Sequence, residues 1–490
     1  MLVADNEVKT VASVADDATT IARMRDVLVR QRTAFVEQGA PTAKQRIDQL
    51  DRVFALLADH RNEICEAMAA DYVVRAPEQT LLADVVACVD GIKHAKKHLH
   101  RWMRPSRRSP NFPLGLLGAK AHVHYQPLGV IGNIVPWNFP VYLAIGPLIG
   151  MLAAGNRAMI KMSEFVPHTA ALFERLVAAA FDETEVAVFP GGPEVGAAFG
   201  ALPFDHLFFT GSPKIGKLVM RAASENLTPV TLELGGKSPV VVGRRADLAL
   251  VARRVAWAKT FNGGQVCLAP DYVLVPEESR AAFVEAFQAA VAQMYPTIRD
   301  NPHYTSIIND LQYQRVRSYL DDARDRGVQV VEVNPAGEDF ATQAARKMPP
   351  MLLIDPADDC LVMQNEIFGP LLPVKTYGAI DDAIGYVNAR ARPLALYYFG
   401  NDRAEAARVL ARTTSGGACV NECIVHVMQD ELPFGGCGNS GMGAYHGEQG
   451  FRTFSHAKSV YTATKRDPFF LLRPPYGKAL DRLIRFQLRR

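Results

Sequence analysis

Apolar residues recur every three to four positions near the start of the chain, after a polar leader, and this spacing predicts two amphipathic helices. Thr42 stands before the second helix and is of a residue type that caps helix N-termini. The C-terminal residues 478–490 alternate basic and apolar side chains at the same spacing. This favours a C-terminal helix docked on the protein over one lying on a membrane surface. The apolar stripes are Ile21, Met24, Leu28 and Phe35; Ile47, Leu50, Val53 and Leu57; and Leu480, Leu483, Ile484, Phe486 and Leu488.

From residue 121 onward, short apolar runs alternate with helical stripes. This β-α-β rhythm predicts a mostly parallel, doubly wound sheet, which binds nucleotides at the carboxyl ends of its strands. The predicted strands are 122–127, 129–135, 158–161, 186–189, 206–210 and 230–234, and the predicted helices are 142–154, 167–180 and 214–223.

A second α/β series begins at residue 238 and ends near residue 425, before a glycine-rich run (435–443) that we interpret as a boundary. Residues 101–120 are rich in Arg, Pro and Gly and are expected to form a connection. The predicted strands of this series are 239–242, 272–275 and 394–399, and its helices are 248–262, 278–294, 312–326, 380–389 and 403–413.

Residues 121–156 carry no Asp, Glu, Lys or Arg, which raises the question of a membrane span. Pro136, Pro140 and Pro147 divide this segment into short pieces. It therefore predicts a buried strand, a loop and a buried helix. The start of the chain is acidic and lacks a continuous apolar run, so no signal peptide is expected. These features favour a cytoplasmic protein without a stable membrane anchor.

The composition is that of an ordinary globular protein. The chain has 490 residues, 49% hydrophobic and 21% charged, with a formal net charge of +3, which gives no argument for a nucleic-acid partner. The length suggests two to four domains. There are seven cysteines, an odd number without a C-x-x-C pair, so we expect neither a disulfide framework nor a zinc site. We therefore predict a reducing compartment and no metal.

The most informative residues are a thiol and a carboxylate. Cys267 closes the run Gly-Gly-Gln-Val-Cys (263–267), and Glu233 lies on a strand-like run that ends in Gly-Gly. No histidine partner is evident. A thiol with a carboxylate suits chemistry in which sulfur forms a covalent adduct and the acid later activates water.

Several strand ends carry candidate ligand contacts. Gly211, Ser212 and Gly216 stand between a predicted strand and helix, where backbone amides could approach a pyrophosphate. Lys161 and Glu164 end another strand and could hold ribose hydroxyls. Other strand ends and turns carry Asn138, a possible oxyanion donor, and Glu366 and Phe368 before a Gly-Pro turn. Taken one at a time, these motifs fit plain turns or exposed strand ends at least as well.

Taken together, the motifs resemble the NAD(P)-dependent aldehyde dehydrogenase superfamily over nearly the whole chain, from about residue 20 to 465. Pro-Trp-Asn-Phe-Pro, Phe-Thr-Gly-Ser, Leu-Glu-Leu-Gly-Gly-Lys-Ser-Pro, Gly-Gln-x-Cys and Glu-Ile-Phe-Gly-Pro occur in the family's order. The chain is most similar to the class 3 branch and, within it, to bacterial coniferyl-aldehyde dehydrogenases. Residues 228–231, 269–274, 433–436 and 441–447 carry this closer match.

The resemblance implies an α/β fold with a Rossmann-like cofactor domain, an α/β catalytic domain and a small β oligomerisation element that forms a homodimer or homotetramer. The implied boundaries are 1–107 and 128–234 for the NAD(P)-binding domain, 235–427 for the catalytic domain, 108–127 and 428–465 for the oligomerisation element, and 466–490 for a C-terminal tail.

The resemblance also implies roles for the candidate residues. Cys267 is the expected nucleophile, Glu233 the base that activates water, and Asn138 with the Cys267 amide the oxyanion hole. NAD, with NADP possible, is the expected cofactor, and the resemblance implies no metal. The expected cofactor contacts are Trp137, Lys161, Glu164, Gly211, Ser212, Gly216, Leu234, Glu366 and Phe368.

The implied reaction oxidises an aldehyde to the carboxylic acid through a thiohemiacetal and a thioester on Cys267. Cinnamaldehyde-type aldehydes such as coniferyl aldehyde, and medium- or long-chain aliphatic aldehydes, both suit this branch. Residues 421–431, with Ile424, His426 and Met428, are expected to line the entrance. A CoA-acylating dehydrogenase and a catalytically silent binding protein on the same scaffold stay open as alternatives, although Glu233 argues against the first.

Overall fold

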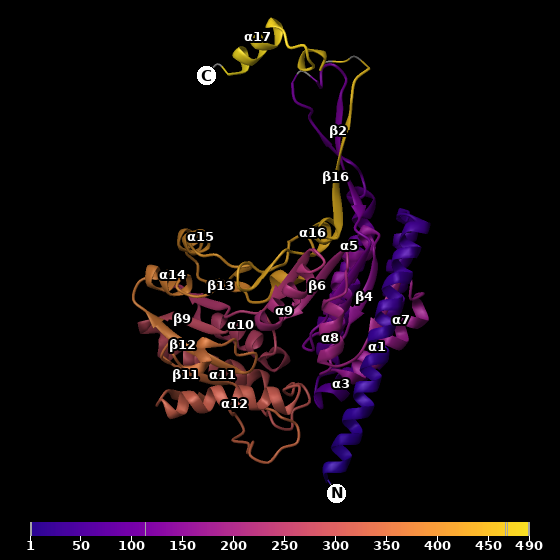
Figure 1. The fold of residues 1–490 in the computed structure, drawn as a ribbon. Coiled ribbons are helices and arrows are strands. Elements are labelled where there is room, and N and C mark those ends of the chain that lie inside the picture. The colour runs from indigo at the N-terminus through magenta and orange to yellow at the C-terminus, as the bar shows by residue number, and fades with distance from the viewer. Residues whose placement is uncertain (1, 113, 466, 468, 489–490) are drawn as a thin grey trace.

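The computed structural model describes residues 2–112, 114–465, 467 and 469–488, with only the backbone described at residues 2–16 and 471. It contains two large sheets, each packed with helices, and a thin β arm that projects away from both (Figure 1). The α/β class is therefore confirmed.

The first sheet has six strands in the order β15-β7-β6-β3-β4-β5. All are parallel except β15, which runs antiparallel to β7. Alternate residues of its strands belong to two different hydrophobic cores, so helices cover both faces. The strands are β3 (Val130–Ile134), β4 (Arg157–Lys161), β5 (Val186–Phe189), β6 (His206–Gly211), β7 (Val230–Leu234) and β15 (Gly441–Met442), and the surrounding helices are α1 (Leu2–Gln38), α2 (Ala43–Asp59), α3 (Arg61–Tyr72), α5 (Ala87–Trp102), α6 (Pro140–Ala154), α7 (Pro167–Ala180), α8 (Pro193–Gly200) and α9 (Pro213–Ser224).

The second sheet has seven strands in the order β10-β11-β12-β9-β8-β13-β14, with β10 alone antiparallel. One hydrophobic core contains residues of both sheets, so the two sheets and their helices are packed together. The strands are β8 (Pro239–Val242), β9 (Tyr272–Pro276), β10 (Gln329–Glu332), β11 (Met351–Ile354), β12 (Leu371–Tyr377), β13 (Ala395–Phe399) and β14 (Gly417–Val420), and the helices include α10 (Leu248–Thr260), α11 (Arg280–Met294), α12 (Asp310–Asp325), α14 (Ile380–Asn388) and α15 (Arg403–Arg412).

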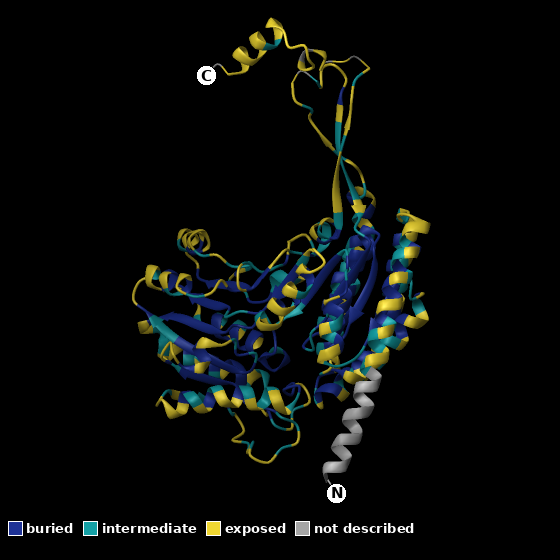
Figure 2. Cartoon of the chain, viewed as in Figure 1, coloured by how far each residue is buried: buried dark blue, intermediate teal, exposed yellow. Residues whose placement is uncertain are grey.

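The β arm consists of β1 (Ser106–Arg108), β2 (Lys120–Pro127) and β16 (Ser455–Thr462), all antiparallel. β2 and β16 pair along their whole length, although they are far apart in sequence. The expected pairing of the strand near His122 with the end of the chain is therefore present. Most of the distal arm is exposed (Figure 2).

The two helices predicted near the N-terminus are present, and the first is longer than predicted. Thr42 caps α2 through a capping box with Gln45. The backbone of α1 begins at Leu2, so the predicted polar leader is helical as well.

The uncharged segment 121–156 forms most of β2, then β3 and the buried helix α6, as predicted. None of the described helices is long and apolar enough to cross a bilayer.

The predicted docking of the C-terminal helix is wrong. Helix α17 (Lys478–Gln487) lies beyond the arm, and none of its residues is buried (Figure 2). Leu483, Ile484 and Phe486 are exposed, Phe486 to 73%. Helical periodicity reveals an apolar face but not what covers that face.

Candidate active site

Glu233 lies where the two sheets meet. It occupies β7 of the first sheet, beside Gly441 of β15, and the chain passes from β7 directly into β8 of the second sheet. Gly235 and Gly236 make this crossing. A Cβ atom at Gly235 would lie 2.0 Å from Oε2 of Glu366, so only glycine lets the Glu366 loop approach β7. The two sequence motifs that contain Glu233 and Glu366 are therefore in contact.

Cys267 follows a left-handed turn at the end of α10. Asn262, Gly263 and Gly264 all have positive φ, of 52°, 62° and 78°. A Cβ atom at Gly264 would lie 2.4 Å from the carbonyl oxygen of Gly369, which makes glycine necessary there. The turn brings the half-buried thiol of Cys267 between the two sheets.

The loop before Cys267 is held by the buried side chain of Gln265. Its amide donates to the carbonyls of Asn262 (2.8 Å) and Ser306 (3.0 Å), and its oxygen accepts from the backbone N–H of Ile308 (2.9 Å). Asn138, from the loop after β3, donates through Nδ2 to the carbonyl of Gln265 (3.2 Å). The structure thus brings Asn138 to the backbone two residues before the thiol.

A buried ion pair, missed by the sequence analysis, supports the Asn138 loop. Arg75 Nη2 lies 2.7 Å from Asp84 Oδ2, and neither side chain is exposed. Arg75 also donates to the carbonyl of Asn138 (2.8 Å), as does the hydroxyl of Tyr72 (3.0 Å). Asp84 in turn accepts from the backbone N–H of Tyr142 (3.1 Å). Neither partner lies in a recognisable motif, so only the tertiary structure reveals this support.

Replacing Arg75 with leucine should lower the free energy of unfolding by about 3 to 5 kcal/mol, because the carboxylate of Asp84 is left buried without its cation. Urea denaturation measures this. The control is Arg280→Leu, which breaks an ion pair with Asp355 whose side chains are 44% and 37% exposed, and should cost at most about 1 kcal/mol. Equal losses in the two variants would contradict the supporting role of Arg75.

The electrostatics of the thiol and the carboxylate are dominated by burial. Glu233 is 3% exposed, and neither of its carboxylate oxygens has a hydrogen-bond partner among the described residues. Burial raises its pKa well above the usual range. Burial, followed by the nearby charges of Glu366 and Glu233, raises the pKa of Cys267 to about 12. The two carboxyl oxygens of Glu233 are buried without a partner among the described residues, so they are suited to bind a water molecule by hydrogen bonding.

Lys161 and Glu164, the candidate ribose ligands, differ in accessibility. Lys161 ends β4 and is buried, and its Nζ donates to the carbonyls of Met162 (2.6 Å) and Gly191 (2.7 Å). Burial lowers its pKa to about 8. Glu164 is exposed and free to meet a ligand. The structure therefore leaves the carboxylate more available than the ammonium.

Close packing alone requires glycine at Gly211 and Gly216 of the candidate phosphate turn. A Cβ atom at Gly216 would lie 2.7 Å from a methyl group of Leu234, and one at Gly211 would lie 2.6 Å from the ring of Phe209. Glycine thus lets α9 approach β6 and β7 closely. Ser212 is the N-cap of α9 and accepts from the N–H of Ile215 (3.4 Å), which leaves its hydroxyl proton available to a ligand.

Glu366, Phe368 and Trp137 lie together. The rings of Trp137 and Phe368 meet edge-to-face with centroids 5.2 Å apart, and Phe368 has a positive φ of 48°. Arg315 supports this turn by donating to the carbonyls of Ile367 (2.9 Å) and Phe368 (3.3 Å). Burial raises the pKa of Glu366 to about 8, and its Oε1 has no hydrogen-bond partner among the described residues.

Comparison with known proteins places this geometry in a family. Residues 6–460 match the profile of the aldehyde dehydrogenase family. A protein from Caulobacter vibrioides named probable coniferyl aldehyde dehydrogenase is 56% identical over 472 residues, which cover 96% of this chain and 97% of that protein. Coniferyl aldehyde dehydrogenase from Pseudomonas sp. is 52% identical over 463 residues, covering 94% of this chain and 95% of that protein.

The fold is also shared with a solved structure. The substrate-bound state of Staphylococcus aureus AldH superposes with a TM-score of 0.89 at 34% identity, covering 95% of this chain and 99% of that one. Mammalian proteins named aldehyde dehydrogenase family 3 match as well. The chain is therefore a member of the aldehyde dehydrogenase family and catalyses NAD(P)-dependent oxidation of aldehydes.

Proposed function

We propose that Cys267 is the nucleophile of this reaction and that Glu233 is the base that hydrolyses the resulting thioester. The observation that carries the proposal is the buried carboxyl of Glu233, whose two oxygens have no hydrogen-bond partner among the described residues. This carboxyl lies close enough to Cys267 for a negative charge on it to raise the pKa of the thiol. A carboxyl in this setting is suited to accept a proton from water.

In the first step the thiol of Cys267 gives its proton to water, and the thiolate sulfur adds to the aldehyde carbon. The carbonyl oxygen becomes an oxyanion, which requires fixed donors. The Nδ2 of Asn138, held near the carbonyl of Gln265, and the backbone amide of Cys267 are the proposed donors. The Arg75–Asp84 pair keeps the Asn138 loop in place before the substrate arrives.

The residues around the two sheet edges fit a dinucleotide. When bound, NAD(P) supplies the hydride acceptor of the oxidation. We assign the adenosine ribose to Glu164 and Lys161, the pyrophosphate to the turn with Gly211 and Ser212, with Gly216 and Leu234 packed beneath it, and the nicotinamide end to Glu366, Phe368 and Trp137. The unpaired Oε1 of Glu366 supports this assignment, because a buried carboxylate oxygen needs a donor.

In the second half-reaction Glu233 takes a proton from water, and the resulting hydroxide attacks the thioester carbon and expels the Cys267 thiolate. A CoA-acylating enzyme would not need a base at this position, and a silent scaffold would need neither residue. The retained pair of Glu233 and Cys267 supports hydrolysis.

For the substrate, we propose aromatic aldehydes of the cinnamaldehyde type. The support is a cluster of rings, of which Tyr142 and Tyr445 lie within range of electrostatic interaction with Cys267. The hydroxyl of Tyr142 lies 3.0 Å from Nε2 of His446, whose ring stacks on Phe434 at 5.2 Å. The hydroxyl of Tyr445 and Nδ1 of His446 are buried without hydrogen-bond partners among the described residues, so they could meet the polar groups of a phenolic ring. Both similar bacterial proteins carry coniferyl aldehyde in their names.

Only some of the residues in the predicted entrance, 421–431, lie near this cluster of rings. Ile424 is buried in the main hydrophobic core, and Met428 is 63% exposed. His426 lies beside Phe434, with ring centroids 5.9 Å apart. The sequence analysis missed Tyr142, Phe434 and Tyr445 as neighbours, because they come from separate segments.

An aldehyde panel tests the reaction and the substrate class together. We expect coniferyl aldehyde to exceed acetaldehyde in kcat/KM by at least about 100-fold, since each buried methylene-sized group contributes roughly 0.8 kcal/mol. Octanal should fall between them. The acid should form at the same rate with and without added CoA. Equal kcat/KM values for the three aldehydes would contradict the substrate proposal, and acyl-CoA formation would contradict hydrolysis.

We also propose that NAD is preferred over NADP, with measurable NADP use. Exposed Glu164 can accept from both ribose hydroxyls and would repel a 2′-phosphate. Lys161, which could attract that phosphate, already donates to two carbonyls.

Glu164→Gln should raise the ratio of NADP to NAD efficiency by at least about 5-fold, because unit charges about 4 Å apart repel by about 1 to 4 kcal/mol. Steady-state kinetics with both cofactors measure the ratio. Glu225→Gln, another exposed position beside the same sheet, serves as the control and should leave it unchanged. A wild-type preference for NADP, or an unchanged ratio in Glu164→Gln, would remove Glu164 from the ribose site.

The domain division and the oligomer remain proposals. The exposed arm of β1, β2 and β16 supports an oligomerisation element that pairs at least two chains. Within the segment 428–465, however, β15 belongs to the six-stranded sheet and the helix α16 (Gly447–Thr453) packs on α6. We therefore propose that the arm proper is limited to residues near 106–127 and 455–462.

A further inference from the structure

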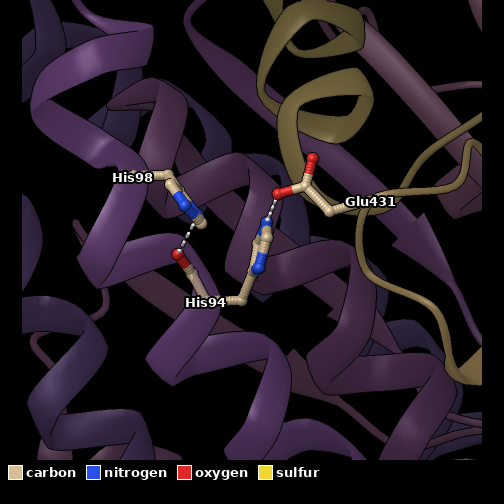
Figure 3. A group of neighbouring side chains, drawn as sticks. All are labelled: His94, His98 and Glu431. Atoms are coloured by element: carbon tan, nitrogen blue, oxygen red, sulfur yellow. Dashed lines mark hydrogen bonds and ion pairs between the residues drawn. The ribbon is translucent and has the colours of Figure 1, made fainter.

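Two histidines and a glutamate meet away from the proposed catalytic residues. His94 and His98 lie one turn apart on α5, and Glu431 comes from the loop after the short helix Val425–Met428 (Figure 3). Their potential ligand atoms all lie within 4.8 Å of one another. The two imidazole rings are close together and tilted by 54°, with centroids 4.3 Å apart.

The hydrogen bonds around the pair suit metal binding. Nδ1 of His98 donates to the backbone carbonyl of His94 at 3.1 Å, which leaves the lone pair of its Nε2 free. Metal-binding histidines commonly use one nitrogen in this way, since the bond to a carbonyl fixes the ring. Nε2 of His94 is buried, makes no hydrogen bond among the described residues, and lies 3.3 Å from Oε1 of Glu431.

The distances are close to those of a tetrahedral site. With zinc–nitrogen bonds of about 2.0 to 2.1 Å, two ligand atoms of a tetrahedron lie about 3.3 Å apart. The separation between His94 and Glu431 already has this value. Glu431 is 68% exposed and can swing toward His98. Asp430 lies close enough to His94 for their charges to interact, which adds negative potential for a cation.

We propose that His94, His98 and Glu431 bind one divalent transition-metal ion of the zinc type, with water as the fourth ligand. Imidazole ligands favour such ions over magnesium or calcium. The cysteine pattern gave no indication of this site, because none of its three residues is a cysteine. The run His-Ala-Lys-Lys-His lacks the glutamate of hydrolytic zinc helices, so the motif itself does not indicate hydrolysis.

The proposed ion would connect the segment 421–431 to helix α5. Glu431 ends the segment 421–431, whereas α5 packs firmly on α6 of the first sheet. His94 also packs closely against Gly447, because a Cβ atom at Gly447 would lie 3.3 Å from Nε2 of His94. Metal binding should therefore tie the segment 421–431 to α5.

The test is calorimetric titration of Zn²⁺ into the EDTA-treated, dialysed full-length enzyme. We expect one equivalent per chain, with affinity lowered at least about 10-fold in both His98→Ala and Glu431→Gln. The control His100→Ala removes an exposed histidine of the same helix and should keep the affinity. Cys267→Ala should also keep it, which excludes binding through that thiol.

Cobalt provides an independent readout that does not depend on activity. Co²⁺ bound to the wild type should show visible d–d bands without a near-ultraviolet sulfur-to-cobalt band, and His98→Ala should lose the visible bands. Circular dichroism of the metal-free variants verifies that they are folded. The proposal is overturned if zinc does not bind, or if its affinity is unchanged in both His98→Ala and Glu431→Gln.

Discussion

Replacing Cys267 with alanine is expected to lower kcat by at least about 10⁴-fold, because covalent catalysis has no substitute once its nucleophile is removed. The side chain is half-buried, and the loop before it is held by the buried side chain of Gln265, which the substitution leaves in place. Folding and NAD binding should therefore stay near wild type. NADH absorbance measures turnover, and intrinsic fluorescence measures cofactor binding.

Cys437→Ala is the matched control for this result. Cys437 is also a half-buried free thiol, and it lies in the glycine-rich run near β15. We expect its replacement to leave kcat within about 3-fold of wild type, as most substitutions outside special sites have small effects. Turnover retained by Cys267→Ala and lost by Cys437→Ala would transfer the nucleophile to the glycine-rich run.

Glu233→Gln should separate the two half-reactions. The amide cannot take a proton from water, so the enzyme should release a burst of about one NADH per active site and then turn over about 10² to 10⁴ times more slowly than wild type. Stopped-flow absorbance resolves the burst. Glu66→Gln, an exposed position, is the control and should show wild-type turnover without a stall.

The pH dependence of the steady-state rate of the wild type should also report on Glu233. Burial raises the pKa of Glu233, and only its deprotonated form can act as the base. The steady-state rate should therefore be low at acidic pH and rise as the pH passes through this raised pKa. In Glu233→Gln that rise should disappear from the slow phase. A slow phase with an unchanged pH profile would show that another group activates water.

Much of the fold could be predicted from the alternation of apolar runs with glycine and proline. Strands β5, β7 and β8 and helix α7 have the predicted boundaries. Each begins or ends at, or next to, a proline or glycine, and these residues mark the limits of helices and strands. Helix α5 was missed although its buried residues have helical spacing, so its signal was present in the sequence. The exposure of α17 could not be predicted, because periodicity does not specify a partner.

The candidate site shows a similar division. Motifs identified Cys267, Glu233 and Asn138, and the structure brings them to the junction of two sheets. The buried pair of Arg75 and Asp84 carries no local signal, since its partners are defined by the packing of a π-helical turn (Leu81–Val86) against the Asn138 loop. Close approaches such as that of Gly235 to Glu366 likewise need the tertiary structure.

The central claim is that the aldehyde becomes covalently attached to Cys267 before water releases it. Mass spectrometry of Glu233→Gln, quenched in acid after mixing with NAD and coniferyl aldehyde, tests this most directly. We expect the mass of one acyl group on the peptide that contains Cys267, absent when NAD is omitted or when Cys267→Ala is combined with Glu233→Gln. A full NADH burst without any acylated peptide, or an acyl group on another cysteine, would contradict the account.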